Sequence, residues 1–474
     1  MAKRLSGSYD RSLIEGPLRS AVWKLAWPTI VVNVIGGFQG LIDNVLVGHF
    51  VGYKGNAAIS ISWQIFIFVI VFISSTFIGM SVLVSRFVGA DDPDKVNRVV
   101  YQAFLTAMFL SFVVLGPVGY LLSPFLLGFV SASPDVIKEA LPFLRISFAF
   151  SGGMLIFFML GGALRAAGDA RTPMVLGVVT TLLNILFNVI LIKGLGPIPA
   201  FGTKGAAMGT AIAFGLVAVY SLWRLWHGGW VVEFPRHHGL RPDWDIILQL
   251  FKFGLPAGFQ GIAMNLGGIF MARFIGHTEH GAEAQAAFGI AYSQLFSFIT
   301  WTSQALLGAS ATVAGQNLGA HNPQRANDAV HAAARIGLYG AAAVGVFFLV
   351  IPRQLFAAFG MTDATVLDIG AQLLRILGVS GLFITVALTY TGGLQGTGDT
   401  KSPMWISIIS QIIIPIGICF TLQQIGTLQP IHIWVAILIG HMTRCTLSVI
   451  RFNQGEWRKI TVRVGKDDRA AAAL

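Results

Sequence analysis

The sequence predicts an all-α integral membrane protein with 12 transmembrane helices, in two six-helix bundles related by a pseudo-two-fold axis along the membrane normal. The 474 residues are 55% hydrophobic and only 11% charged, with mean hydropathy +0.72, whereas soluble domains carry about 25% charged residues. The apolar runs are long and continuous, which is typical of spanning helices and not of β-barrel strands. An internal repeat gives each half of the chain six spans. A soluble enzyme is therefore excluded.

Twelve apolar segments are long enough to cross a bilayer, since a crossing takes about 20 residues. The predicted spans are 25–48, 57–84, 99–122, 139–163, 173–193, 205–226, 251–275, 284–313, 329–351, 366–393, 403–424 and 429–450. The predicted domains are a tail 1–24, a first bundle 25–226, a basic linker 227–250, a second bundle 251–450 and a tail 451–474.

The positive charge of the chain follows the predicted topology. When both tails, every second loop and the adjoining ends of the spans are assigned to one side, 24 of the 32 Lys and Arg residues fall there. Cytoplasmic loops are enriched in these residues, so both termini are predicted to be cytoplasmic. The net charge of +11 therefore indicates orientation in the membrane and not a nucleic-acid partner. Residues 1–20 are polar and the first apolar run is long, so the first helix is expected to act as the insertion signal.

The two halves match at an offset of 228 residues in their first helices and 230 residues further on. At the larger offset, the loop GADDP at 89–93 corresponds to GAHNP at 319–323, and GDARTPM at 168–174 corresponds to GDTKSPM at 398–404. Each half has an even number of spans, so the repeat is parallel, as in transporters that rock one bundle against the other. In these loops Gly is expected to turn the chain, Asp to cap a helix and Pro to begin it.

Asp43 is the one acidic residue that lies well inside a predicted span. An ionised Asp at a helix centre costs about 2.5–3.5 kcal/mol on insertion scales, so it is expected to face a cavity, a partner or a proton. The alternative is a position near enough to the outer end to be solvated. Gly36 and Gly40 share its helical stripe, and they would allow close approach of a neighbouring helix or serve simple packing.

The fifth span carries a second polar stripe, because Thr180, Asn184 and Asn188 recur every four residues. Interhelical hydrogen bonds and ion coordination both explain such a stripe. Asp43, Asn184 and Asn188 correspond in the second half to three apolar residues. These are Met271, Ile414 and Ile418. Packing residues needed by the fold would be expected in both halves, so the asymmetry favours a functional site in the first.

Gln64 and Gln294 occupy equivalent positions in the two halves. They suit either hydrogen bonds within the scaffold or, together with Thr180, the wall of a substrate cavity between the bundles.

Four motifs together resemble the multidrug and toxic compound extrusion (MATE) family over nearly the whole chain. They are LRAAGDARTP at 164–173, its counterpart at 394–403, the GADDP loop and DNVLVGH at 43–49. The resemblance implies export of amphipathic, often cationic, organic compounds in exchange for a cation. It implies a proton or sodium gradient as the energy source, with no other cofactor, and a multi-pass location in the bacterial inner membrane.

Within that family the chain is most similar to the branch of DNA-damage-inducible protein F. The branch pairs a first-helix Asp, here Asp43, with Asn-x-x-x-Asp in the fifth helix. Asn184 keeps the first of those positions, Asn188 replaces the second, and Thr210 corresponds to a sixth-helix Thr. The resemblance therefore predicts a cation-coupling site at Asp43, Asn184, Asn188 and Thr210. A single carboxylate favours protons, although backbone carbonyls near Gly36 could complete a shell for sodium.

The function predicted is a monomeric antiporter for small drug-like compounds, surrounded by lipid and without enzymatic activity. The alternative is a flippase for a lipid-linked precursor, which should meet pyrophosphate with several cations. The only candidates for that role are three isolated arginines, Arg145, Arg273 and Arg375. The motif His277-x-Glu279-His280 has two histidines three residues apart, as on a metal-binding helix face. It lies in a short outer loop without a third ligand nearby, so a solvated loop and no metal site is expected.

Overall fold

The structure is a computed structural model that describes residues 9–130, 133–234 and 241–462. Residues 235–240 of the predicted linker and the distal parts of both predicted tails lie outside the described residues. The described chain is helical throughout, and its only extended pairing is an isolated bridge between Leu195 and Ile198. The all-α membrane fold predicted from composition is confirmed.

Ten described helical segments are long and apolar enough to cross a membrane. An eleventh is obtained if Pro134–Ala149 and Gly152–Ala166, which are bent by 51° relative to each other, form one span. The remaining predicted span, 284–313, falls on helical segments between Gly281 and Gly319 that are not among the ten. A π-helical segment, Gly289–Leu295, interrupts it.

The chain divides into two compact units. The described part of unit 1 comprises residues 9–10 and Val31–Gly258, and that of unit 2 comprises Arg11–Ile30 and Phe259–Val462. Two long helices therefore belong partly to each unit, namely α2 (Leu18–Phe50) and α11 (Trp244–Gly276). Each contains a proline, Pro28 or Pro256, within two residues of the division.

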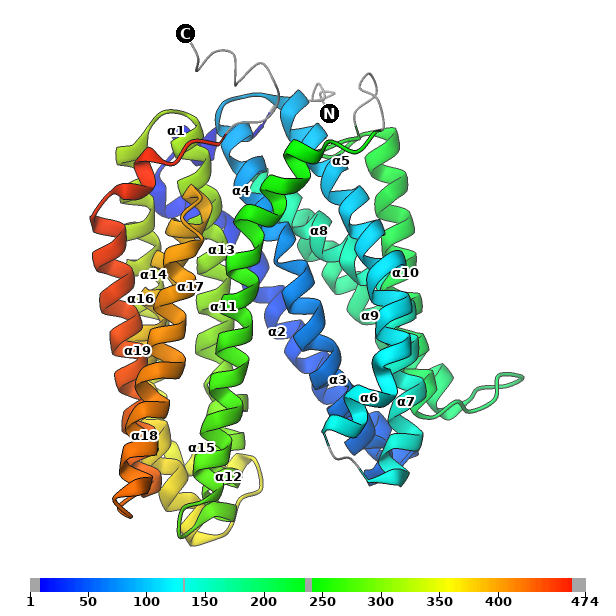
Figure 1. The fold of residues 1–474 in the computed structure, drawn as a ribbon, viewed down its shortest axis with the longest axis vertical. Coiled ribbons are helices and arrows are strands. Elements are labelled where there is room, and N and C mark those ends of the chain that lie inside the picture. Colours follow the sequence, from blue (N-terminus) through cyan, green and yellow to red (C-terminus); the bar gives the residue numbers. More distant parts are fainter. Residues whose placement is uncertain (1–8, 131–132, 235–240, 463–474) are drawn as a thin grey trace. The chain divides into compact units, whose positions relative to one another are not determined.

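The other helices of unit 1 follow one another along the chain (Figure 1). They are α3 (Tyr53–Ser74), α4 (Thr76–Gly89), α5 (Pro93–Phe109), the π-helical Leu110–Gly119, α6 (Tyr120–Phe129), α7 (Pro134–Ala149), α8 (Gly152–Ala166), α9 (Arg171–Lys193) and α10 (Thr203–His227).

Unit 2 is built in the same way. Its helices are α1 (Ser12–Glu15), α12 (Gly281–Phe288), the π-helical Gly289–Leu295, α13 (Ser297–Gly319), α14 (Pro323–Val350), α15 (Pro352–Ala358), α16 (Ala364–Thr397), α17 (Lys401–Ile408), the π-helical Ile409–Ile413, α18 (Ile414–Gln424), α19 (Pro430–Asn453) and a final 3₁₀ turn, Glu456–Lys459.

The repeated GADDP and GAHNP loops have the same backbone and the same cap. Asp91 and His321 both have φ of 57°. Asp92 accepts a hydrogen bond from the backbone N–H of Lys95 at 3.0 Å, and Asn322 accepts one from that of Arg325 at 3.0 Å. The side chains thus satisfy N–H groups that the first turn of α5 or α14 leaves unpaired. The capping role predicted from the sequence is confirmed.

The second pair of repeated loops also matches. Gly168 and Gly398 have φ of 97° and 100°, a region that favours glycine. Asp169 and Asp399 then accept hydrogen bonds from backbone N–H and side-chain hydroxyl groups of the helix that follows. Asp399 additionally pairs with Arg451 of α19 at 3.0 Å. The second loop is therefore tied to a neighbouring helix by a charge pair.

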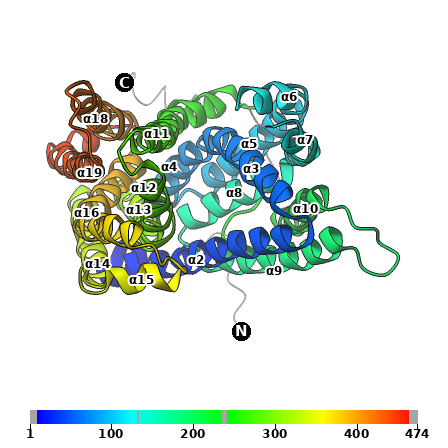
Figure 2. The ribbon, with the colours of Figure 1, turned by 90° about the horizontal axis from the view of Figure 1, so that it is seen from below.

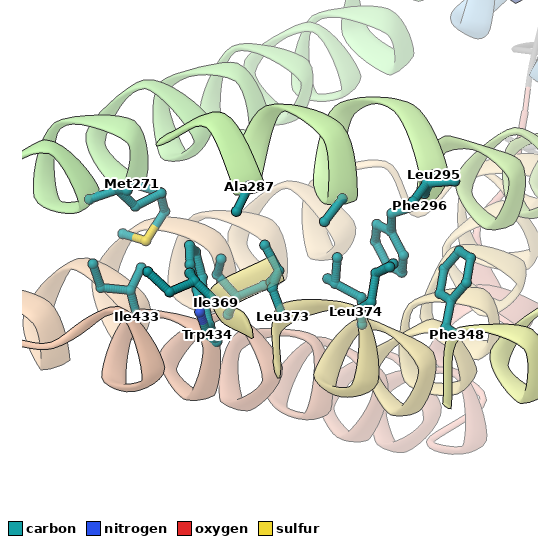
Figure 3. Packing of buried hydrophobic residues seen from close by; sticks show 14 of the residues in the cluster. Met271, Ala287, Leu295, Phe296, Phe348, Ile369, Leu373, Leu374, Ile433 and Trp434 are labelled. Atoms are coloured by element: carbon teal, nitrogen blue, oxygen red, sulfur yellow. The ribbon is translucent and has the colours of Figure 1, made fainter. Parts of the chain in front are cut away.

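The core of unit 2 is continuous along the helices that enclose α16. Figure 3 shows Met271, Phe296, Leu374 and Trp434 among its buried side chains. Trp434 stacks on Phe288 with ring centroids 5.9 Å apart. Because lipid is as apolar as this interior, such helices are held by close van der Waals packing rather than by escape from water.

Candidate functional site

The candidate site lies in unit 1, where α2, α9 and α10 meet. Figure 2 shows α2 running along α9, and hydrogen bonds join these two helices. α10 packs closely on α9 because two of its glycines face that helix. A Cβ at Gly205 would overlap the carbonyl of Leu191, and one at Gly209 would overlap the side-chain oxygen of Asn188. The glycines therefore bring α10 near enough to share hydrogen bonds with α9.

Asp43 is half-buried on α2 and faces α9. Its Oδ1 accepts a hydrogen bond of 2.8 Å from Nδ2 of Asn188. The same amide nitrogen lies 3.1 Å from Oδ1 of Asn184, to which it also donates. Both asparagines are buried, at 0% and 1% exposure. The carboxylate is therefore held by a neutral donor that is itself fixed by a second amide.

The hydrogen bonds continue to the third helix. Asn184 donates through Nδ2 to the hydroxyl of Thr210 at 2.9 Å. Thr210 donates in turn to the carbonyl of Ala206 in its own helix, at 3.0 Å. The four residues predicted as the coupling site, Asp43, Asn184, Asn188 and Thr210, thus form one connected network within unit 1.

Gln39 and Thr181 join this network although the sequence prediction did not include them. Gln39 donates to Oδ1 of Asn184 at 2.8 Å and accepts from the hydroxyl of Thr181 at 2.9 Å. Gln39 lies four residues before Asp43, hence on the same face of α2. That spacing is the signal that could have identified it, because the stripe was recognised only through its glycines.

One polar atom at the centre of the network is unsatisfied. Oδ1 of Asn188 is buried and has no hydrogen-bond partner. A buried acceptor without a partner costs about 1–3 kcal/mol. At this oxygen, next to Asp43, the network can therefore accept one more hydrogen bond.

The residues predicted for the substrate cavity do not join the network. Thr180 is buried, but its hydroxyl donates to the carbonyl of Leu176 in its own helix at 2.7 Å. Gln64 is an exposed residue of α3 in unit 1. Gln294 is an exposed residue of the π-helical segment in unit 2.

A small cavity of unit 1 adjoins the network through Thr210. It measures about 20 Å³, which is room for a water molecule. Its walls are mainly aromatic and apolar. They are formed by Trp63, Phe66, Phe143, Ser147, Phe150, Ser151, Met154, Ala207, Thr210, Ala211 and Phe214. The polar network therefore borders an apolar, aromatic wall. Within the described residues there is no group of three His, Cys, Asp or Glu side chains that could hold a metal ion.

Comparison with known proteins gives consistent matches over both halves. The MatE family model matches residues 28–190 and 256–421. A Thermotoga maritima protein named probable multidrug resistance protein NorM is 25% identical, over 94% of this chain and 94% of its own. Multidrug resistance protein PmpM of Pseudomonas aeruginosa is also 25% identical, over 95% of this chain and 94% of its own.

A solved structure has the same fold. It is described as the outward-facing conformation of a multidrug resistance MATE family transporter of the MOP superfamily. It superposes with a TM-score of 0.87 at 21% identity, covering 97% of this chain and 100% of that chain. The assignment to the branch of DNA-damage-inducible protein F stays a prediction.

Proposed function

The chain belongs to the MatE family, and from this premise we propose that it is a secondary active antiporter that exports amphipathic, often cationic, organic compounds in exchange for protons. The names of its relatives support multidrug efflux as the class of function. The observation that carries the coupling step is Asp43, an ionisable side chain held half-buried by neutral amides in unit 1.

Protonation of Asp43 would reverse the direction of its hydrogen bond to Asn188. The ionised carboxylate only accepts, and Nδ2 of Asn188 now serves it. A protonated carboxyl group also donates, and the unpartnered Oδ1 of Asn188 is an acceptor for it once the amide turns over. That turn would remove the Asn188 donor from Asn184. A change in the protonation state of Asp43 would thereby alter the hydrogen bonds that involve α9 and α10.

This chemistry favours protons over sodium. Oδ1 of Asp43 accepts a hydrogen bond from an amide donor 2.8 Å away, and an N–H group repels a cation placed beside that oxygen. Sodium would also require several oxygen ligands with charge to compensate its lost hydration. A proton needs only the carboxylate. Its inward movement is worth about 2.3 kcal/mol per 100 mV of membrane potential.

Transport by everted membrane vesicles tests the coupling ion. Uptake of a fluorescent organic cation should persist in sodium-free buffer when a pH gradient is imposed. It should collapse when a protonophore dissipates the gradient. Uptake that requires a sodium gradient at clamped pH would contradict proton coupling while leaving the export function intact.

We also propose that the protein acts as a monomer in the bacterial inner membrane, with both termini in the cytoplasm and no enzymatic step. The excess of Lys and Arg on the side of the termini supports this orientation. Reporter fusions that are active only in one compartment test this topology. Fusions at the two termini should report the cytoplasm, and a fusion in the loop after His277 should report the opposite side. The same side for all three would contradict this orientation.

A further inference from the structure

The interior of unit 2 contains a charged residue that the proposed antiport does not use. Arg444 lies in α19, within the last predicted span, and is 0% exposed. Its Nε and Nη2 have no hydrogen-bond partner, and Nη1 has only a contact of 3.7 Å with the sulfur of Met264. Among the described residues Arg444 forms no ion pair with a carboxylate, and the nearby Tyr292 carries only a neutral phenol.

An unpaired guanidinium in this position is costly. Arg stays protonated in proteins, and a buried charge without a counter-charge costs several kcal/mol. A charged residue inside a membrane span is normally paired or functional. Arg444 therefore requires a negative partner, and the described part of the protein does not provide one.

A cavity large enough for such a group lies near Arg444, which contacts Met264 in its lining but does not itself line it. It measures about 30 Å³ and is lined by residues of α11, α12, α18, α19 and the two π-helical segments of unit 2. The lining residues are Met264, Gly267, Gly268, Met271, Phe288, Tyr292, Gln411, Pro415 and Ile437. Met264 and Tyr292 are also the neighbours of Arg444. Ile437 lies seven residues before Arg444, on the same face of α19.

The polar groups around this cavity are mainly donors. Nε2 of Gln411 is buried without a partner, and Tyr292 carries a phenolic hydroxyl. The hydroxyls of Ser410 and Ser448, on the same two elements as Gln411 and Arg444, are also buried and unpartnered. Donors around a positive charge match an anion and oppose a cation. The volume equals that of about two water molecules, which suits a monatomic ion and not a phosphate.

We infer that this cavity is a binding site for a chloride-sized monovalent anion, which accepts hydrogen bonds from Gln411 and Tyr292 and is attracted by the charge of Arg444 behind Met264. The anion would neutralise Arg444 and satisfy the donors around it. The inference is independent of the coupling ion proposed for Asp43.

Binding of radioactive chloride to the purified protein tests the site directly. Wild-type protein should bind chloride saturably, with about one ion per chain. Bromide should compete, and phosphate and gluconate should not. Arg444→Gln should abolish the binding. Arg375→Gln, which removes an exposed arginine of α16 in the same unit, should leave it unchanged.

Thermal unfolding adds a second measurement that does not depend on the arginine variant folding. Replacing gluconate by chloride at constant ionic strength should raise the Tm of wild-type protein, because a ligand that binds the folded state stabilises it. Gln411→Leu should reduce chloride affinity several-fold. Absence of saturable chloride binding by wild-type protein would overturn the inference and leave water as the occupant. Stronger competition by phosphate than by bromide would overturn the assigned ion size.

Discussion

Equivalent places in the two repeats carry different polar groups. In unit 1, Gln39, Asp43 and Thr181 form an acidic network with the asparagines of α9. At offsets of 228 and 230 residues, their counterparts in unit 2 all line the cavity near Arg444. These are Gly267, Met271 and Gln411. The same positions thus hold an acidic hydrogen-bond network in unit 1 and line a cavity near a buried arginine in unit 2.

The capping loops, in contrast, are alike in the two repeats. The loops that contain Asp92 and Asn322 have kept the same dihedral angles and the same cap hydrogen bond. Backbone geometry requires them wherever a helix must begin after a tight turn. The interior of each bundle has no such requirement, so its polar side chains could specialise separately.

The largest expected effect is at the acidic centre of unit 1. Asp43→Asn should abolish ion-coupled efflux, because an amide cannot exchange a proton, while the protein still inserts. Met271→Leu, at the equivalent position of unit 2, should retain most activity, because it conserves the volume and polarity of a buried side chain. The measurement is pH-driven uptake of a fluorescent cation by everted vesicles. Undiminished transport by Asp43→Asn would remove the central element of the comparison.

Removal of the amide partners should produce the next largest effect. Asn188→Ala leaves Asp43 without its donor, and Asn184→Ala cuts the connection to Thr210. Each loss is worth about 1.5–3 kcal/mol for a hydrogen bond to a charged group, and somewhat less between neutral groups. We therefore expect transport to fall roughly tenfold or more for Asn188→Ala and less for Asn184→Ala. Ile414→Ala and Ile418→Ala, compared at equal expression, should have smaller effects. Equal losses in both halves would indicate packing roles only.

The close approach of α9 and α10 can be tested by a single methyl group. Gly209→Ala would place a Cβ against the side-chain oxygen of Asn188 and should displace that amide, so transport should fall several-fold. Gly215→Ala, in the same helix, meets nothing within 4 Å and is the matched control. If the two variants transport equally well, Asn188 does not need its observed position.

The smallest expected effects lie in the repeated loops. Asp92→Ala and Asn322→Ala should each destabilise the protein by about 1 kcal/mol, as is typical for a lost N-cap. Asp399→Ala should cost more than Asp169→Ala, because it also removes the partner of Arg451 from a site that is only 6% exposed. Thermal unfolding of purified variants measures both comparisons. A much larger loss for Asp92→Ala than for Asn322→Ala would show that the matching loops contribute unequally.

The membrane class, the helical fold, the repeat and its caps could all be predicted from the sequence. Length of apolar runs decides whether a segment can cross a bilayer, and a turn with Gly, Asp and Pro restricts the backbone locally. Each of these two signals lies within one continuous segment of the chain. Spacing on single helices also identified Asp43 and the stripe through Asn184 and Asn188, because residues four apart share a face.

Which of these helix faces meet was visible only in the folded protein. It joined Gln39 and Thr181 to the network through contacts between helices more than 100 residues apart, and it left Thr180 bonded within its own helix. It also revealed that Arg444 is fully buried, which its position in the last predicted span did not show. A hydrogen-bond partner or its absence depends on the approach of separate helices, and no local pattern of the sequence encodes that approach.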